Sequence, residues 1–403
     1  PGRPFPSSRD VAKPDRISER FTACVGSRQH HAGRCHAGRV VYQRFDCPIQ
    51  RAIAGGVKPK IVAVKFDGNG LISVRDVDPV GEMTNPNSLV REVPTGLAGI
   101  QAPVRDRLDL ILDELRRIVV ADFDLIDEVN DYLLLLPGKL FRPTLVLLAN
   151  EVGDSPTSDA VTFGAVIELV HLATLVHDDA VDHSVLRRGQ PTVNALWTHQ
   201  IAIIMGDYLY SRAMTELAEV GSIEAFRTLA DAANEMSVGE MRQLTAFDGL
   251  DFTEDDYHHL IAAKTASLMG AACDMGALAG VQEYREPLRR FGHNLGMAFQ
   301  VADDILDYVG SEEETGKPVA QDLREQKVTL PLIGALKAAS SAAESEMKDF
   351  FLEGAEHTDE EIFRIVQLVG ELGGVDYAKN QAKVFAGRAE EALSGLPEGP
   401  ALR

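Results

Sequence analysis

Apolar side chains recur at three- and four-residue spacing through most of this 403-residue chain, from about residue 103 onward. Leu108, Ile111, Leu115 and Ile118 show the pattern, which places apolar residues on one face of an α-helix. Strand-like alternation does not extend over a useful length in this part of the sequence. The spacing therefore predicts an all-α fold, a bundle of helices around an apolar core.

Glycine and proline interrupt the pattern and set the expected helix limits. The predicted helices cover residues 104–120, 125–136, 141–152, 159–182, 200–219, 223–246, 257–280, 285–309, 329–338, 341–353, 359–372 and 375–394. Residues 159–176 and 262–280 are apolar on nearly every side, so we expect them at the centre of the bundle. No repeat of short fixed period occurs, which excludes a solenoid and leaves one domain of roughly 300 residues.

The composition excludes several classes of function. Hydrophobic residues make up 45% of the chain and charged residues 25%, and the formal net charge is −21. Such an acidic chain is not a general nucleic-acid binder, and an anionic substrate would need a local basic site or a metal ion. No run of eighteen apolar residues occurs, so no transmembrane segment is expected. The four cysteines do not form a disulfide scaffold and favour a reducing compartment, the cytoplasm.

The first 82 residues differ from the rest of the chain. They hold 14 Lys and Arg against 8 Asp and Glu, whereas the remainder holds 26 against 53. Three of the four cysteines lie in this segment, and all nine methionines lie at or after Met83. The segment lacks helical apolar periodicity until a short strand-like run, Ile61–Val64. We therefore expect an N-terminal extension over residues 1–82 and the helical domain over residues 83–403.

Three interpretations of this extension remain open. It is a disordered basic tail, a small metal site, or upstream sequence joined to a gene that starts at Met83. The metal site would use Cys24, His30, His31, Cys35, His36 and Cys47. The gaps of 11 and 12 residues between these cysteines lack the short paired spacing of zinc ligands, so the third interpretation is favoured.

Two aspartate triplets, each ending an apolar helical run, are the strongest functional signal. Both have the form Asp-Asp-x-x-Asp, and they comprise Asp178, Asp179 and Asp182, and Asp303, Asp304 and Asp307. Side chains four residues apart share one face of a helix, so the outer carboxylates of each triplet are neighbours. A solvated acidic helix end would explain one copy, but two copies favour a cation site. Mg²⁺ takes such oxygen ligands together with substrate phosphates and water.

Basic residues near the triplets would balance an anionic substrate. Arginine matches phosphate oxygens with its forked donors and lysine supplies a point charge, although each one alone is ordinarily a solvated surface charge. Lys264 is different, because it lies in an otherwise apolar helix and needs a partner if it is buried. The other basic residues of interest are Lys139, Arg142, Arg187, Arg188, Lys317, Arg324 and Lys327.

Residues 130–335 resemble the trans-isoprenyl diphosphate synthases, the polyprenyl synthetases, of the medium- and long-chain type. Besides the triplets, the motifs that carry the resemblance are GKLFRP from Gly138, RRG from Arg187, GDYL from Gly206, KT from Lys264, FQVADD from Phe299, and GKP with DLREQKVTLP from Gly316. The resemblance implies an all-α isoprenoid-synthase-type bundle around a central active-site cavity, usually as a homodimer. Its substrates would be isopentenyl diphosphate and an allylic diphosphate.

The resemblance also implies a role for each matching residue. Three Mg²⁺ ions, with Mn²⁺ as an alternative, would be ligated by Asp178, Asp182 and Asp303, and through water by Asp179, Asp304 and Asp307. Contacts to the allylic diphosphate would come from Arg187, Lys264, Thr265, Gln300 and Lys317. The pocket for isopentenyl diphosphate would comprise Lys139, Arg142, His171 and Arg188. Catalysis would rest on Asp178, Asp182, Asp303 and Lys264.

Two details qualify the second pocket. His171 lies seven residues before Asp178, two helical turns away, so we expect it to face the same cavity rather than act as a core histidine. The family box often reads GGKRxRP, whereas Pro137 and Leu140 replace its first glycine and its internal arginine here. We expect this pocket to work with weaker affinity.

The expected chemistry follows from charge. Mg²⁺ would neutralise the allylic diphosphate and make it a better leaving group, and no Ser–His or Cys–His nucleophile is needed. The double bond of isopentenyl diphosphate would then attack the allylic cation, with loss of a proton. The family implies that the departing pyrophosphate accepts that proton.

Product length would depend on the wall below the first triplet. Val170, Ala173 and Thr174 lie one to two helical turns before Asp178. These side chains are small and leave room for a growing prenyl chain, so we predict a medium- or long-chain product such as a quinone side-chain precursor.

Three alternatives remain at this stage. A class I terpene cyclase would not need a second triplet or the basic residues Lys139, Arg142 and Arg188. A non-catalytic partner subunit of a heteromeric synthase would be expected to lack the ligands. A short-chain farnesyl or geranylgeranyl diphosphate synthase is the nearest alternative.

Overall fold

The computed structural model describes residues 62–66, 72–76, 96–135, 138–153, 156–187, 189–245, 252–310, 320–351 and 357–402. The chain divides into two units, Pro1–Thr84 and Asn85–Arg403, which are taken separately. In the first unit, β1 (Val62–Phe66) pairs antiparallel with β2 (Ile72–Asp76), so the strand-like run does form a strand. The cysteines and histidines of the metal-site interpretation lie outside the described residues. The interpretation of residues 1–82 stays a prediction.

The described part of the second unit is helical apart from one short ladder. Its long helices are α4 (Arg105–Ile118), α5 (Asp124–Leu135), α6 (Phe141–Glu151), α7 (Asp159–Val181), α9 (His199–Val220), α10 (Ile223–Thr245), α11 (Glu254–Ile261), α12 (Ser267–Ala279), α13 (Arg285–Val309), α16 (Leu330–Ala338), α17 (Ser341–Phe350), α18 (Asp359–Glu371) and α19 (Gly374–Leu393). The shorter elements are α3 (Leu97–Gln101), α8 (Val193–Leu196), α15 (Gln321–Arg324), β3 (Leu186–Arg187) and β4 (Gln190–Pro191). The all-α prediction is confirmed.

Apolar periodicity produces these helices as expected. In α4 the predicted core positions Leu108, Ile111, Leu115 and Ile118 are all buried. Removing each such side chain from water contributes about 1.5–3 kcal/mol, far more than helix propensity alone. At α11, the Thr253 side chain accepts from the backbone N–H three residues on in a reciprocal capping box, which fixes where this helix starts.

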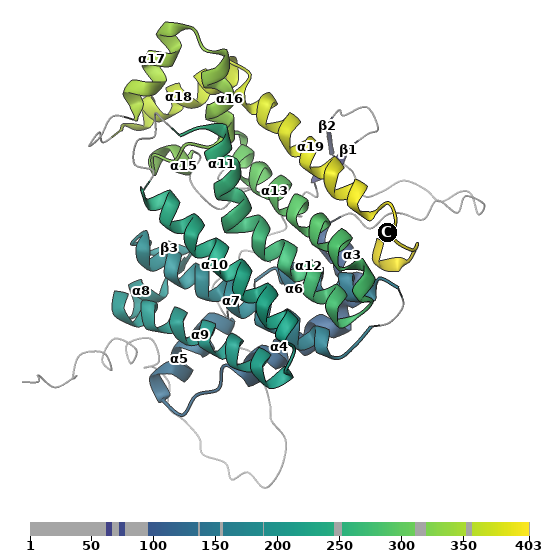
Figure 1. Ribbon diagram of the computed structural model, residues 1–403. Coiled ribbons are helices and arrows are strands. Elements are labelled where there is room, and N and C mark those ends of the chain that lie inside the picture. The colour runs from purple at the N-terminus through teal and green to yellow at the C-terminus, as the bar shows by residue number, and fades with distance from the viewer. Residues whose placement is uncertain are drawn as a thin grey trace, which may run out of the picture. The chain divides into compact units, whose positions relative to one another are not determined.

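Helix α12 lies at the centre of the second unit. It packs against α6, α7, α10 and α13, and Figure 1 shows α10, α12, α13 and α19 side by side. All of its residues except the last are buried. A Cβ at Gly276 would lie 2.2 Å from the Val146 carbonyl oxygen of α6, so only glycine permits this approach. The predicted central position of this helix is confirmed.

Helix α7 is the second central element. Among the described helices it alone is long and apolar enough to cross a membrane, but 61% of its most apolar window is buried inside the protein. It packs against α4, α6, α9 and α12. We therefore interpret α7 as a core helix, and its C-terminal end carries the first triplet.

Candidate active site

The first triplet closes helix α7, and helix α9 positions that end. Asp178 and Asp179 lie in the last turn and Asp182 caps the helix. The His177 ring packs on Gly206 of α9, where a Cβ would lie 2.2 Å from the ring Nε2. This contact explains the glycine of the GDYL motif, because any side chain there would push the two helices apart.

Within the first triplet, the middle carboxylate is engaged by an arginine. Asp179 is 7% exposed, and Arg187 Nε donates to its two oxygens at 2.8 and 2.9 Å. Arg187, expected at the allylic diphosphate, therefore also holds Asp179. Asp182 is exposed, and no side chain of the described residues donates a hydrogen bond to it. The outer carboxylates are thus the ones available to a cation.

The second triplet, near the end of α13, shows the same division. Asp304 is 5% exposed and accepts hydrogen bonds on both oxygens, from Tyr257 Oη at 2.6 Å and from Gln300 Nε2 at 2.9 Å. Asp303 is exposed, and no described side chain donates a hydrogen bond to it. The neighbouring carboxylates therefore lie in opposite environments, one in the core and one open to solvent.

The last carboxylate of this triplet organises the chain that follows. Asp307 accepts from the backbone N–H groups of Gln321 and Asp322, both at 3.0 Å. These are the first residues of α15, so a carboxylate sits at the start of that helix, where backbone donors are unsatisfied. Residues 311–319, which lie between, are outside the described part.

A π-helical turn over Ala262–Ala266 joins α11 to α12 and carries Lys264 and Thr265. The sequence pattern predicted one continuous helix over residues 257–280, so this turn is a correction. A π turn opens the helical hydrogen-bond ladder by one residue, and such turns are frequent at functional sites.

Lys264 has the partners that its apolar surroundings demand. Its Nζ lies 2.6 Å from Glu240 Oε2, 3.2 Å from Gln243 Oε1 and 3.6 Å from Asp178 Oδ2. The prediction that this lysine needs a partner is confirmed. The contacts place the π turn against both α10 and the end of α7.

Thr265 connects the same turn to the second triplet. Its hydroxyl donates to Gln300 Oε1 at 2.8 Å, and Gln300 in turn donates to Asp304. Two consecutive residues, Lys264 and Thr265, therefore reach the two triplets. Carboxylates 125 positions apart in sequence, Asp178 and Asp303, are brought to one region of the protein.

The GKLFRP box lies between the helices that carry the triplets. The Phe141 ring stacks on Phe299 of α13, with ring centroids 5.6 Å apart. A Cβ at Gly138 would lie 3.0 Å from Glu168 Oε1 of α7. Lys139 is exposed and Arg142 is half-buried at the start of α6.

The remaining predicted residues fall into three groups. His171 and Thr174 are half-buried on α7, and the Thr174 hydroxyl donates to the His171 carbonyl oxygen at 2.8 Å. Val170 and Ala173 are 1% and 2% exposed within the main apolar core. Arg188 and Lys317 lie outside the described residues, so their roles stay predictions.

The site carries more negative charge than its own cations balance. Burial raises the pKa of Asp178, with Lys264 opposing the shift and Glu240 adding to it. Burial also raises the pKa of Asp304 to about 6, although its two hydrogen bonds act in the opposite direction. Burial and the nearby Asp307 raise the pKa of Asp322 to about 7. Burial is the main cause of all three shifts, and a cation bound nearby would lower each pKa.

Sequence reasoning missed several residues of this region. Glu240 and Gln243 belong to a helix with an ordinary amphipathic pattern, and Tyr257 lies on an apolar helix face, so the sequence pattern did not single them out. Asp322 and Lys327 belong to the tail motif but carried no assigned role. Burial alone would lower the pKa of Lys327, but Glu325, Asp182 and Asp322 raise it overall, so Lys327 lies within electrostatic reach of the first triplet and of Asp322.

The donor set fits Mg²⁺. The half-buried carboxylate of Asp178 and the exposed carboxylates of Asp182 and Asp303 are hard oxygen donors. No group of three or more His, Cys, Asp or Glu in the described part forms a ready-made metal cage. Mg²⁺ is ordinarily held by one or two carboxylates together with substrate phosphates and water rather than by such a cage.

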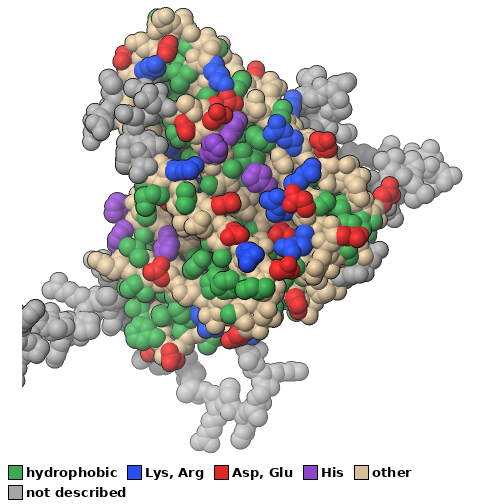
Figure 2. All heavy atoms as spheres, viewed as in Figure 1, with side chains coloured by type: hydrophobic (Ala, Val, Ile, Leu, Met, Phe, Trp, Pro, Cys, Tyr) green, Lys and Arg blue, Asp and Glu red, His purple; other side chains and the backbone are tan. Residues whose placement is uncertain are grey.

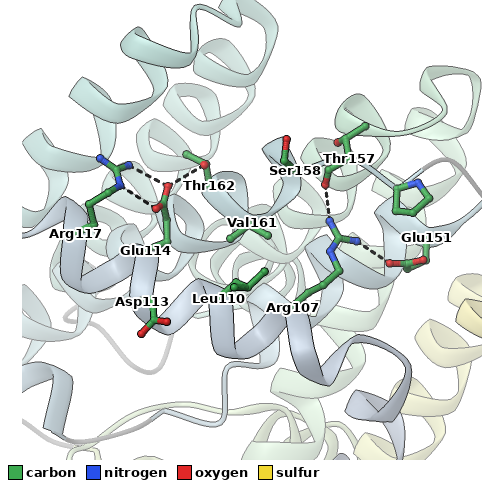
Figure 3. A pocket seen from close by; sticks show the side chains of 11 residues that line it. Arg107, Leu110, Asp113, Glu114, Arg117, Glu151, Thr157, Ser158, Val161 and Thr162 are labelled. Atoms are coloured by element: carbon green, nitrogen blue, oxygen red, sulfur yellow. Dashed lines mark hydrogen bonds and ion pairs between the residues drawn. The ribbon is translucent and has the colours of Figure 1, made fainter.

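One open groove lies elsewhere, between α4 and the start of α7 (Figure 3). It has a volume of about 680 Å³, and its Arg107 and Arg117 are already paired with carboxylates. Thr162 of its wall precedes Asp178 by 16 residues, about 24 Å along the helix. The groove is therefore separate from the triplets.

Comparisons with known proteins show which family this chain resembles. The family model of the polyprenyl synthetases matches residues 123–369. An all-trans-nonaprenyl-diphosphate synthase (geranyl-diphosphate specific) of Rhodobacter capsulatus is 38% identical over 301 residues, which are 74% of this chain and 92% of that protein.

Two crystal structures are also similar. A decaprenyl diphosphate synthase from Rhodobacter capsulatus gives a TM-score of 0.72 at 32% identity, covering 76% of this chain and 95% of that one. A polyprenyl synthase from Caulobacter crescentus, complexed with calcium and isoprenyl diphosphate, gives 0.72 at 31%, covering 76% and 94%. With its helical bundle, its two converging triplets and these matches, the chain belongs to the polyprenyl synthetase family.

Proposed function

We propose that this protein is a trans-prenyltransferase that adds isopentenyl diphosphate repeatedly to an allylic diphosphate, giving an all-trans polyprenyl diphosphate. The observation that carries the proposal is the convergence of both aspartate triplets on the Lys264–Thr265 turn. Open carboxylates beside a lysine form a site for a diphosphate held through divalent cations.

In this proposal, different residues bind the two diphosphate substrates. Lys264 lies beside Asp178 and would bind an oxygen of the allylic diphosphate, releasing part of its hold on Glu240. Lys139 and Arg142 precede and begin α6, and would bind isopentenyl diphosphate between α7 and α13. Holding both substrates in one site replaces a bimolecular encounter with an oriented one.

The cofactor in this proposal is Mg²⁺, three ions in all, held by Asp178, Asp182 and Asp303. When bound, the ions neutralise the allylic diphosphate and make it a better leaving group. Asp179 and Asp304 support the same site from the core, through Arg187 and Tyr257. The domain responsible would be residues 83–403.

The product is proposed to be of medium or long chain length. Val170 and Ala173, below the first triplet, are small or medium-sized and have no aromatic ring to close the space. Relatives named for nonaprenyl and decaprenyl products support this choice over a short-chain synthase.

Incubation with labelled isopentenyl diphosphate, geranyl diphosphate and Mg²⁺ tests the proposal. Chromatography of the dephosphorylated products should show alcohols of seven or more isoprene units, and chelation with EDTA should abolish them. Products that stop at three or four units would support the short-chain alternative. A cyclic hydrocarbon would support a terpene cyclase, and no conversion would support a non-catalytic subunit.

We further propose a homodimer in the cytoplasm. Large apolar side chains are exposed on neighbouring helices α9 and α10, among them Ile203 and Ile204 at 41% and 60% and Met241 at 62% exposure. Figure 2 shows hydrophobic side chains on the surface over these helices. Contiguous apolar surface of this kind favours association. Light scattering that gives the mass of one chain would contradict the dimer.

A further inference from the structure

Asp304 is the most buried of the six triplet aspartates, at 5% exposure, yet it is flanked by the open Asp303. Both of its carboxylate oxygens already have protein donors, the hydroxyl of Tyr257 at 2.6 Å and the amide of Gln300 at 2.9 Å. Tyr257 is itself only 2% exposed. A carboxylate held in this way has lost the freedom to turn toward solvent.

These contacts extend beyond one pair. Gln300 Oε1 accepts from the Thr265 hydroxyl at 2.8 Å, and the preceding Lys264 lies 3.6 Å from Asp178. Tyr257 lies on α11, the helix that leads directly into the π turn. Gln300 and Asp304 lie one turn apart on α13. The network therefore ties α13 to α11 at the level where the two triplets meet.

Consecutive residues of a helix point about 100° apart, so fixing one fixes the direction of the other. When Asp304 is held in the core, Asp303 must face the open side of α13. If the Tyr257 hydroxyl were lost, a buried charged oxygen would remain without a donor, and the end of α13 would be free to turn or shift in compensation.

We propose that Tyr257 is a positioning residue for the cation site, which holds Asp304 in the core so that Asp303 faces the ions, and that Asp304 itself ligates none. This inference rests on the proposed function, because it assumes that Asp303 receives a Mg²⁺ ion. Tyr257 lies outside all the sequence motifs that carry the family resemblance.

The test compares Tyr257→Phe with Tyr377→Phe in the full chain. Tyr377 is a matched control, because its hydroxyl also bonds a carboxylate of α11, Glu254 at 2.8 Å, but contacts neither triplet. The probe is Mg²⁺ with inorganic pyrophosphate, and the readout is the thermal unfolding midpoint as Mg²⁺ is titrated. We expect Tyr257→Phe to need about tenfold more Mg²⁺ for half of the shift, as the loss of a hydrogen bond to a charged group implies. Tyr377→Phe should match the wild type.

A second pair of variants, Asp304→Asn and Asp303→Asn, tests the inference even if Tyr257→Phe folds poorly. Asp304→Asn should keep Mg²⁺ binding within about threefold, since the amide still bonds Tyr257 or Gln300, whereas Asp303→Asn should lose it. Equal losses in both variants would show that Asp304 is a ligand and overturn the inference. So would a Tyr257→Phe titration that matches Tyr377→Phe, or a wild-type midpoint that Mg²⁺ and pyrophosphate do not move.

Enzyme assays separate this inference from the proposed function. In the wild type, a midpoint that responds to Mg²⁺ and pyrophosphate without any prenyl product would refute the proposed reaction. The comparison of Tyr257 with Tyr377 would still decide the positioning role. With an active enzyme, Tyr257→Phe should lower kcat and leave KM for isopentenyl diphosphate within about twofold, because that pocket is built on α6.

Discussion

Single residues divide the two triplets into open and engaged carboxylates. In each triplet the middle aspartate is buried and hydrogen-bonded, Asp179 by Arg187 and Asp304 by Tyr257 and Gln300. Outer aspartates such as Asp182 remain exposed. The same Asp-Asp-x-x-Asp pattern therefore contains exposed carboxylates, which we propose as cation ligands, and buried carboxylates that are held by hydrogen bonds.

At the residue scale, replacing Asp178 by alanine tests the ligand assignment. Asp178→Ala removes an open carboxylate beside Lys264 and should lower kcat at least about 100-fold, because the metal-held diphosphate loses a support that matters most as it leaves. Circular dichroism should show an unchanged helical content. Asp109→Ala, at an exposed position of α4, is the control and should keep full activity. Near-normal turnover of Asp178→Ala would refute the assignment.

The sequence could identify the chemistry of these residues but not their partners. That Lys264 required a counter-charge was predictable from its apolar neighbours, whereas the identity of Glu240 depends on how α10 packs against the π turn. Tyr257 was unpredictable for the same reason. A buried tyrosine on an apolar helix face gives no sign of which acceptor lies opposite.

Between elements, close helix contacts set the position of the first triplet. Gly206→Ala would place a Cβ 2.2 Å from the His177 ring, so either this ring or the end of α7 must shift. We expect a loss of about 1–3 kcal/mol in the free energy of unfolding and a raised KM for the allylic diphosphate. Urea unfolding and steady-state kinetics measure the two effects.

The control for this variant is Gly370→Ala in α18, where an added Cβ meets nothing within 4 Å. It should be neutral or slightly stabilising, because alanine favours a helix more than glycine does. Truncating the ring in the double variant Gly206→Ala with His177→Ala should restore the stability. A Gly206→Ala protein as stable and active as the wild type would show that α9 does not position the triplet.

The proposed determinant of product length also belongs to the scale of elements, because it lies on α7 before the first triplet. Ala173 is buried about one turn before the triplet, and Ala173→Phe should shorten the main product by adding bulk beneath the proposed site. Ala160→Phe, buried in the same helix but 18 residues before Asp178, should leave the product unchanged. Chromatography of labelled alcohols gives the comparison. Identical product lengths for Ala173→Phe and the wild type would place the wall elsewhere.

The sequence predicted the ends of helices more accurately than the irregular turns that join them. The predicted helix over residues 285–309 has the same bounds in the structure, because apolar spacing and flanking breakers define it. The helix predicted over 257–280 instead contains the π turn Ala262–Ala266. Local spacing does not reveal such a turn, since its hydrogen bonds change while the residues remain helix formers.

At the scale of the whole molecule, the site exists only because three distant segments meet. Helix α7 ends on the first triplet, α13 carries the second, and the turn between α11 and α12 contacts both. The sequence predicted which helices would be central, and burial of α12 confirmed it. Which helix ends would converge depended on the packing of glycines such as Gly276, which no single-sequence pattern displays.

The most direct test of this convergence is an anomalous difference map from crystals grown with Mn²⁺ and inorganic pyrophosphate. We expect manganese peaks between the pair Asp178 and Asp182 and the carboxylate of Asp303, with pyrophosphate bound beside them and Lys264 in contact. Peaks confined to one triplet, or manganese bound away from both, would contradict this expectation.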